Sequence, residues 1–85
     1  MTDLIRDRYE PLEVVARGGQ GELLRALDHQ HGRQVALKVR PAPGPEQREE
    51  VLREARVLLA LRPHPNLAVV RDDFFVDDRY YLVMD

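Results

Sequence analysis

The chain has 85 residues, of which 44% are hydrophobic and 33% are charged, with 13 basic side chains against 15 acidic ones. This composition is typical of one ordinary globular domain. A formal charge of −2 gives no field that attracts a polyanion, so we expect neither nucleic acid nor an anionic membrane surface as a partner. Cysteine is absent, which excludes disulfides and thiolate metal sites and fits the cytoplasm. No stretch approaches the roughly 20 apolar residues of a membrane span, and no targeting segment is expected.

The first part of the chain predicts a β-hairpin. Residues 9–16 combine β-branched and aromatic side chains with acids, and Pro11 favours an edge position for this strand. The glycine-rich residues 17–21 interrupt the pattern, and residues 22–28 alternate loosely before a turn at 29–32. We therefore expect two antiparallel strands joined by a flexible tip.

The middle of the chain predicts a third strand followed by a helix. Residues 33–40 are the most apolar strand candidate, and the proline-rich residues 41–45 cannot continue it. Pro45 suits the first position of a helix, which we expect to run for about 17 residues to a stop at 62–63. Its apolar residues at helical spacing are Val51, Leu52, Ala55, Leu58 and Leu59.

Two further strands are predicted at residues 67–75 and 79–84, around a turn at 76–78. The resulting order is strand, strand, strand, helix, strand, strand, and its hairpin links are short. This order predicts an α+β fold, with a five-stranded antiparallel sheet and one amphipathic helix on a face of that sheet.

Three glycines within four residues, Gly18, Gly19 and Gly21, are the first candidate site. Without Cβ atoms, their backbone N–H groups can approach an anion closely. The same run also fits a plain flexible turn. A dinucleotide-binding fold is a poorer interpretation, because that fingerprint needs a helix directly after the glycines, and Ala16 stands where its first glycine would be.

Lys38 is the second candidate, because it is the only lysine beside twelve arginines. In a strand it shares a face with Ala36 and Arg40. This face suits a flat apolar ring over Ala36 with a phosphate tail that reaches the Lys38 ammonium. The alternative is a solvated lysine on an edge strand.

Glu54 is the third candidate. It borders the apolar stripe of the predicted helix and has no cation three or four residues away, so a non-local cation such as Lys38 would suit it. The alternative is a carboxylate turned to solvent. The acidic pairs at 72–73 and 77–78 and the three histidines lack metal-ligand spacing, so we expect no metal site in this chain.

Five motifs in order resemble the N-terminal, ATP-binding lobe of a protein kinase, most closely the eukaryotic-like Ser/Thr protein kinases of bacteria. They are the runs VARGGQGEL at 15–23, VALK at 35–38, REA at 53–55, HPN at 64–66 and YLVMD at 81–85. The resemblance implies an N-terminal extension over residues 1–8 and a kinase lobe over residues 9–85 that ends at the start of the hinge, with the C-terminal lobe absent from this chain.

The resemblance also implies the roles of the candidate residues at the phosphates. Gly18, Gly19 and Gly21 would form the loop over the phosphates of ATP. Lys38 would contact the α- and β-phosphates, and Glu54 on the helix would hold Lys38 in place.

On the adenine side, the resemblance implies five more site residues. Val15, Leu23 and Ala36 would cover the ring, Met84 would stand at the gatekeeper position, and Asp85 would begin the hinge. Two further positions would pack the helix against the sheet, namely Leu58 and Val70.

The chain departs from the kinase pattern at single positions and at the level of whole motifs. Ala16 replaces the usual first glycine, Leu23 the usual valine and Asp85 the commoner glutamate. The H-R-D and D-F-G motifs are absent, so the catalytic base and the Mg²⁺ ligands are expected beyond Asp85. We therefore predict the ATP-binding lobe of a Ser/Thr protein kinase, inactive as residues 1–85 alone. The alternative is a non-catalytic binding module, either a pseudokinase lobe or a free-standing lobe.

Overall fold

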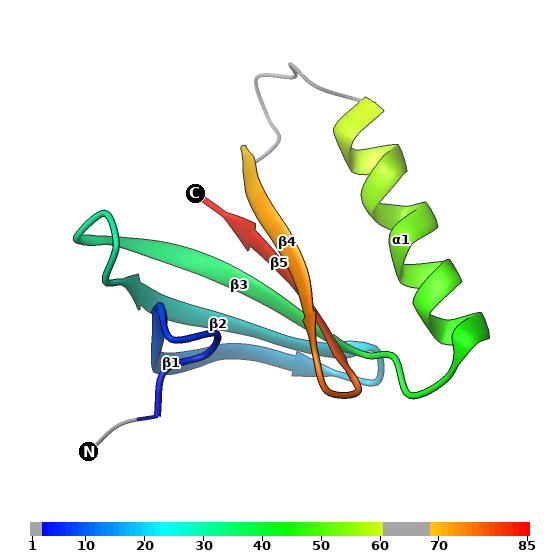
Figure 1. The fold of residues 1–85 in the computed structure, drawn as a ribbon, viewed down its shortest axis with the longest axis horizontal. Coiled ribbons are helices and arrows are strands. Elements are labelled where there is room, and N and C mark those ends of the chain that lie inside the picture. Colours follow the sequence, from blue (N-terminus) through cyan, green and yellow to red (C-terminus); the bar gives the residue numbers. More distant parts are fainter. Residues whose placement is uncertain (1–2, 61–68) are drawn as a thin grey trace.

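The computed structural model describes residues 3–60 and 69–85, without the side chains of Leu58 and Leu59. Its elements in chain order are β1 (Tyr9–Gly18), β2 (Gly21–Asp28), β3 (Arg33–Pro41), α1 (Pro45–Ala60), β4 (Val70–Val76) and β5 (Arg79–Met84). The strands form one antiparallel sheet in the order β1-β2-β3-β5-β4, and the helix stands beside its β4 and β5 strands (Figure 1). The predicted α+β fold and its order of elements are confirmed.

The glycine-rich tip of the first hairpin is more regular than predicted. Strand β1 continues to Gly18, which pairs with Gly21 at the start of β2, so only Gly19 and Gln20 form the turn. Other predicted features fall partly or wholly outside the described residues: the beginning of the fourth strand at 67–68 and the HPN run at 64–66.

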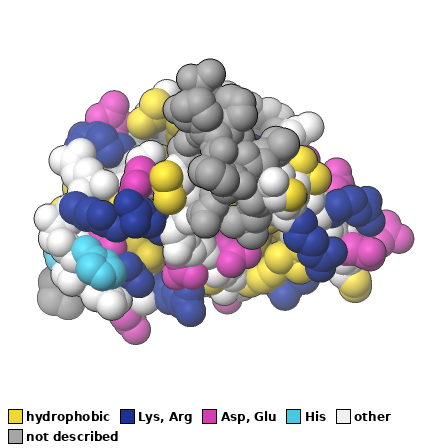
Figure 2. All heavy atoms as spheres, turned by 90° about the horizontal axis from the view of Figure 1, so that it is seen from above, with side chains coloured by type: hydrophobic (Ala, Val, Ile, Leu, Met, Phe, Trp, Pro, Cys, Tyr) yellow, Lys and Arg dark blue, Asp and Glu magenta, His cyan; other side chains and the backbone are white. Residues whose placement is uncertain are grey.

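Charges of both signs are mixed on the surface. Figure 2 shows basic and acidic side chains interspersed over one face, with apolar side chains in small groups between them. Within the described ranges, no helix is both long enough and apolar enough to cross a membrane.

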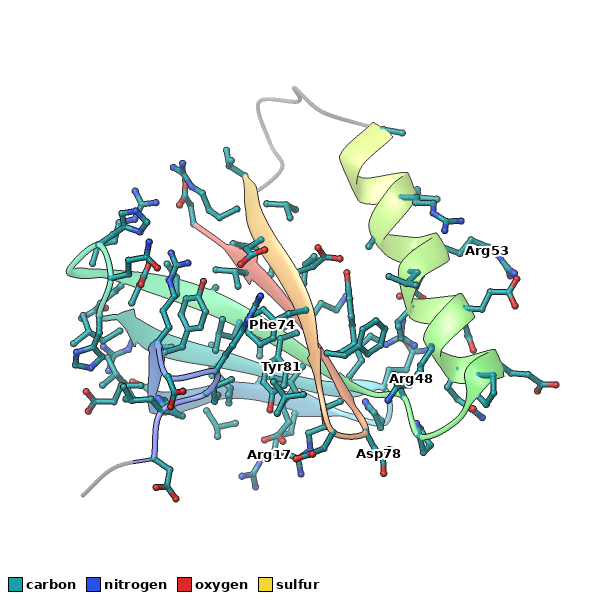
Figure 3. All side chains as sticks on the ribbon, viewed as in Figure 1. Arg17, Arg48, Arg53, Phe74, Asp78 and Tyr81 are labelled. Carbon is teal, nitrogen blue, oxygen red and sulfur yellow. The ribbon has the colours of Figure 1, made fainter. Side chains whose placement is uncertain are left out.

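The larger core cluster lies on the sheet face opposite the helix. It unites the buried residues Tyr9, Ala26, Val35, Leu37, Val39, Phe74, Tyr81 and Val83. Three of its aromatic rings form a continuous stack, with ring centroids 5.8 Å apart for Tyr9 and Phe74 and 5.1 Å apart for Phe74 and Tyr81 (Figure 3). Ile5, which precedes β1 and pairs with Tyr9, packs against this cluster. The apolar residues of β3 at positions 35, 37 and 39 therefore face this cluster and not the helix.

A smaller cluster attaches α1 to the other face. Val51 and Ala55 of the helix are buried with Tyr80 and Leu82 of β5. At the N-terminal end of the helix, Arg48 donates a hydrogen bond to the Asp77 backbone carbonyl (2.9 Å), and its guanidinium lies 4.9 Å from the centre of the Phe75 ring. The described part of the helix thus packs against the β4–β5 side of this face (Figure 1).

A buried carboxylate joins the segment before β1 to the end of β2. Asp28 is 2% exposed and accepts two hydrogen bonds from Arg8, at 2.8 and 2.9 Å, and one from the Gln30 backbone N–H at 3.0 Å. The Arg8 guanidinium holds the pKa of the Asp28 carboxyl well below its usual range, even though burial acts in the opposite direction. The residues just before the first strand are therefore tied into the fold.

Candidate functional site

Antiparallel pairing builds one row of the candidate site across four strands. Ala16 of β1 pairs with Leu23 of β2, Leu23 pairs with Lys38 of β3, and Lys38 pairs with Leu82 of β5. Directly paired residues project from the same face of a sheet. Lys38 therefore stands in an otherwise apolar row on the face of the sheet that carries the helix. This agrees with the predicted alternation of side chains along the strand, which places Lys38 on the face opposite to Leu37 and Val39.

A second row follows two residues further along the strands. Ala36 of β3 pairs with Met84 of β5, and Met84 pairs with Val70 of β4. Together the two rows give the face a small apolar floor beside the Lys38 ammonium.

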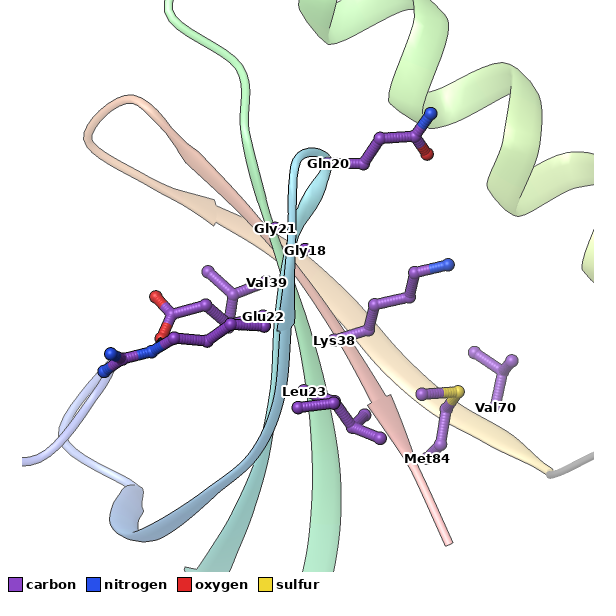
Figure 4. A pocket seen from close by; sticks show the side chains of 11 residues that line it. Gly18, Gln20, Gly21, Glu22, Leu23, Lys38, Val39, Val70 and Met84 are labelled. Atoms are coloured by element: carbon purple, nitrogen blue, oxygen red, sulfur yellow. Dashed lines mark hydrogen bonds and ion pairs between the residues drawn. The ribbon is translucent and has the colours of Figure 1, made fainter.

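A cavity of about 580 Å³ lies between these rows and the turn that joins β1 and β2. In Figure 4, Lys38 lies between Gln20 of the turn and the apolar side chains of Leu23, Met84 and Val70. The lining residues are Ala16, Arg17, Gly18, Gln20, Gly21, Glu22, Leu23, Lys38, Val39, Val70 and Met84. This arrangement gives the cavity an apolar part and a separate cationic part.

The structure brings five of the predicted site residues to the cavity wall: Gly18, Gly21, Leu23, Lys38 and Met84. It places Val15 and Gly19 elsewhere. Strand β1 has a bulge between Val14 and Ala16, so Val15 is left outside the pairing and is 56% exposed, while Ala16 takes its place in the row. Gly19 lines a different hollow of about 380 Å³ on the other side of the turn.

Two further predicted residues, Ala36 and Asp85, do not line the cavity. Ala36 is half-buried in the row that contains Met84. Asp85 accepts two hydrogen bonds from Arg71, at 2.8 and 2.6 Å, and its backbone N–H bonds to the Val69 carbonyl at 3.1 Å. The hydrogen bonds from Arg71 lower the pKa of the Asp85 carboxyl. The chain direction after β5 is therefore set by contacts with β4 and the residue before it.

The three glycines at the tip of the first hairpin have different structural roles. Gly21 has a φ of +138°, and a Cβ atom there would lie 2.0 Å from the carbonyl oxygen of Val39. Only glycine fits at this position. A Cβ atom on Gly18 or Gly19 would meet nothing within 4 Å, so these two residues leave open space around the turn.

Glu54 does not contact the residue predicted for it. Its carboxylate is ion-paired with Arg40 of β3. Within the described part of the chain, the side chain of Lys38 forms neither a hydrogen bond nor an ion pair. The predicted Lys38–Glu54 pair is therefore replaced in this structure by an Arg40–Glu54 pair. The reason is that residues two apart on a strand share a face, so β3 offers the helix two cations.

Sequence reasoning did not select several residues of the cavity wall. In the sequence, Ala16 stands out only as a departure from a glycine pattern, and the kinase resemblance gives Val70 only a packing position. Arg17 and Glu22 face each other across the turn and form an ion pair at 3.2 Å. The pairing of Gly18 with Gly21 would have indicated this contact, because it makes residues 17 and 22 direct neighbours.

Comparison with known proteins agrees with this architecture, although no protein-family model matches the chain. The chain is 43% identical over 70 residues, 81% of its length, to the DNA damage-responsive serine/threonine-protein kinase RqkA of Deinococcus radiodurans. It is 38% identical over 68 residues, 76% of its length, to the serine/threonine-protein kinase PknA of Mycobacterium tuberculosis. A twitchin kinase fragment of C. elegans matches 100% of the chain with a TM-score of 0.82 and 26% sequence identity.

The five-stranded sheet, its single helix and these matches together define the fold of the small lobe of a protein kinase. More particularly, the chain is similar to the N-terminal lobe of Ser/Thr protein kinases, including the two bacterial kinases, as its five motifs predicted. The chain spans only 10% of the length of RqkA, 16% of PknA and 19% of the twitchin fragment.

Proposed function

We propose that this chain is the ATP-binding lobe of a Ser/Thr protein kinase. Joined to a large lobe, it would support attack of a protein hydroxyl on the γ-phosphorus of ATP. The bond from this phosphorus to the oxygen bridging to ADP breaks, ADP leaves, and the hydroxyl proton passes to a base in the large lobe. The observation that carries the proposal is the cavity of about 580 Å³ that joins an apolar floor to a single lysine beneath a glycine-rich turn.

The residues of the cavity divide the work of holding ATP. Leu23, Val70 and Met84 offer an apolar surface for the adenine ring. Lys38 has a compact ammonium that is free to meet the α- and β-phosphates. Because nothing obstructs the space around Gly18 and Gly19, phosphate oxygens could approach the backbone N–H groups of the turn.

Magnesium would be held elsewhere. Among the described residues, no group of three histidine, aspartate or glutamate side chains is placed to hold a metal ion. The Mg²⁺ that accompanies ATP would take its protein ligands from the large lobe. A cytoplasmic location is part of the proposal, and the absence of cysteine is compatible with it.

A non-catalytic binding module is the second candidate, because Ala16 occupies the position of the usual first glycine and lines the cavity. An alanine there restricts the backbone near the phosphates. H-R-D and D-F-G motifs in the remainder of the gene product would favour the kinase, and their absence would favour the module.

Nucleotide binding can be tested by titrating the 85-residue chain with ADP and following its backbone amides by NMR. We expect saturable shifts at Gly18, Gly19 and Gly21. Lys38→Met should weaken the affinity by roughly 10- to 100-fold, because it removes one charge-assisted contact. Arg33→Met is the matched control, since it removes one charge from the exposed start of the same strand. An absence of saturable shifts, or equal affinity in the Lys38→Met chain, would refute the proposed site.

A further inference from the structure

Arg40 and Glu54 form a contact between the sheet and the helix beside the proposed nucleotide site. The side chain of Arg40 is only 12% exposed, whereas that of Glu54 is 48% exposed. Arg40 donates through one terminal nitrogen to the Glu54 carboxylate, and its Nε is buried with no hydrogen-bond partner among residues 3–60 and 69–85. Since the guanidinium has lost most of its water, the Glu54 carboxylate is its main source of compensation.

Lys38 lies at the border between this contact and the nucleotide cavity. A second hollow of about 10 Å³ is lined by Lys38, Arg40 and Glu54 together with apolar residues of α1 and β5. A space of this size holds about one water molecule. Lys38 also lines the cavity of about 580 Å³. Lys38 and Glu54 therefore border the same small hollow without being ion-pair partners.

We propose that Arg40 is a positioning residue that competes with Lys38 for Glu54. In this structure Arg40 holds the carboxylate, and Lys38 has no anchor. Transfer of Glu54 to Lys38 would leave the largely buried Arg40 guanidinium uncompensated, so Arg40 favours the arrangement with an unanchored lysine. The competition itself does not depend on the proposed function. Its consequence does, namely that Arg40 controls whether the phosphate-binding lysine is held in place.

The chain offers a direct probe of this competition, because Lys38 is its only lysine. Selective ¹³C and ¹⁵N labelling of lysine gives one set of side-chain NMR signals that reports on this ammonium alone. In the parent chain, Glu54→Gln should leave the Lys38 signals unchanged, because the carboxylate is bound to Arg40. Arg40→Met, which keeps the straight apolar stem, should shift the Lys38 signals as Glu54 moves to the lysine. That shift should disappear in the double variant Arg40→Met/Glu54→Gln.

Arg33→Met is the matched control, since it removes one positive charge from an exposed position on the same strand, and it should not shift the Lys38 signals. The inference is overturned if Glu54→Gln shifts the Lys38 signals in the parent chain, because Glu54 would then already serve Lys38. It is also overturned if a folded Arg40→Met chain keeps the parent signals. Should Arg40→Met prevent folding, Arg40→Gln, which also removes the positive charge but keeps a polar side chain, takes its place in the same comparison.

These spectra are recorded without nucleotide, so they separate the inference from the proposed function. If Arg40→Met shifts the Lys38 signals and ADP does not bind, the competition stands and the nucleotide site is refuted. If ADP binds and Arg40→Met leaves the Lys38 signals unchanged, the site stands and the competition is refuted.

Discussion

Gly21 and Gly19 show that glycines at the tip of one hairpin can have different structural roles. Gly21 is required by the fold, because of its positive φ and the close approach of the Val39 carbonyl. Gly19 has free space around it and no such conformational requirement. The glycine-rich run therefore contains one position where the backbone requires glycine and one where other residues would fit.

We expect Gly21→Ala to lower the free energy of unfolding by about 2 to 4 kcal/mol, since the Cβ atom would collide with backbone and the φ is unfavourable. Gly19→Ala should change it by less than about 0.5 kcal/mol. Urea unfolding of the two variants measures both values. Equal stabilities for the two would contradict the strand geometry described for Gly21.

The Arg8–Asp28 pair makes stability depend on pH. The pKa of Asp28 is lowered in the folded chain, mainly by the hydrogen bonds from Arg8. A carboxyl with a lowered folded pKa stabilises the fold above its unfolded pKa of about 3.9 and loses that contribution as the pH falls. The stabilisation from Asp28 is therefore complete at neutral pH and declines below about pH 4.

Asp28→Asn should cost about 2 to 3 kcal/mol at pH 7, because it leaves the partly buried Arg8 without its counter-charge. The difference from the parent chain should narrow by about 1 kcal/mol between pH 5 and pH 3. Urea unfolding at several pH values measures this dependence. Glu13→Gln is the control, because Glu13 forms an exposed pair with Arg25, and its effect should stay below about 0.5 kcal/mol. A pH-independent difference for Asp28→Asn would argue against the lowered pKa.

At the scale of elements, the helix is joined to the sheet by a small contact area. Its described contacts with β5 centre on Val51 and Ala55, and Arg48 fastens its first turns to the β4–β5 turn. The helix also carries Glu54, so the position of this carboxylate depends on how α1 sits against the sheet. The exchange of partners proposed for Glu54 would therefore depend on the position of the helix.

Val51→Ala tests how much this packing contributes. Val51 is 2% exposed, and loss of its two methyl groups should cost about 1 to 3 kcal/mol in transfer and cavity free energy. Val57 on the same helix is 56% exposed, so Val57→Ala should change stability by less than about 0.5 kcal/mol. Thermal and urea unfolding give both values. If both variants were equally destabilised, the helix would be covered by something other than the described contacts.

At the scale of the whole molecule, the proposed nucleotide site stands without the motifs that phosphoryl transfer needs in kinases. The sequence lacks the H-R-D and D-F-G motifs, which supply the catalytic base and the Mg²⁺ ligands of kinases. Positioning and charge neutralisation account for most of the catalysis in this reaction.

The purified 85-residue chain should therefore transfer no phosphate from radiolabelled ATP to a generic protein acceptor. The measurement is incorporation above a control without protein, with an active kinase as the positive control. Incorporation that persists after repurification of the chain would contradict the assignment of catalysis to a second lobe.

Most of the fold was predictable because its signals are local. Alternation over residues 33–40 and the proline-rich stop after them place β3, and apolar residues at helical spacing place α1. The row through Leu23 and Lys38 follows from strand parity once β2 and β3 are in register. The bulge at Val15 was not predictable in this way, because one extra residue in a strand leaves no mark in an alternating pattern.

The sequence by itself determined the order of the elements, the kinase-like motifs and the face of β3 on which Lys38 stands, because each depends on residues close together in the chain. Only the tertiary structure decided the partner of Glu54 and the position of the main core on the face away from the helix. Both depend on how far α1 lies from each strand, and this distance results from packing between residues far apart in sequence. Lys38 and Arg40 stand on the same face of β3, so strand spacing alone allowed either of them to pair with Glu54. The placement of the helix selected Arg40.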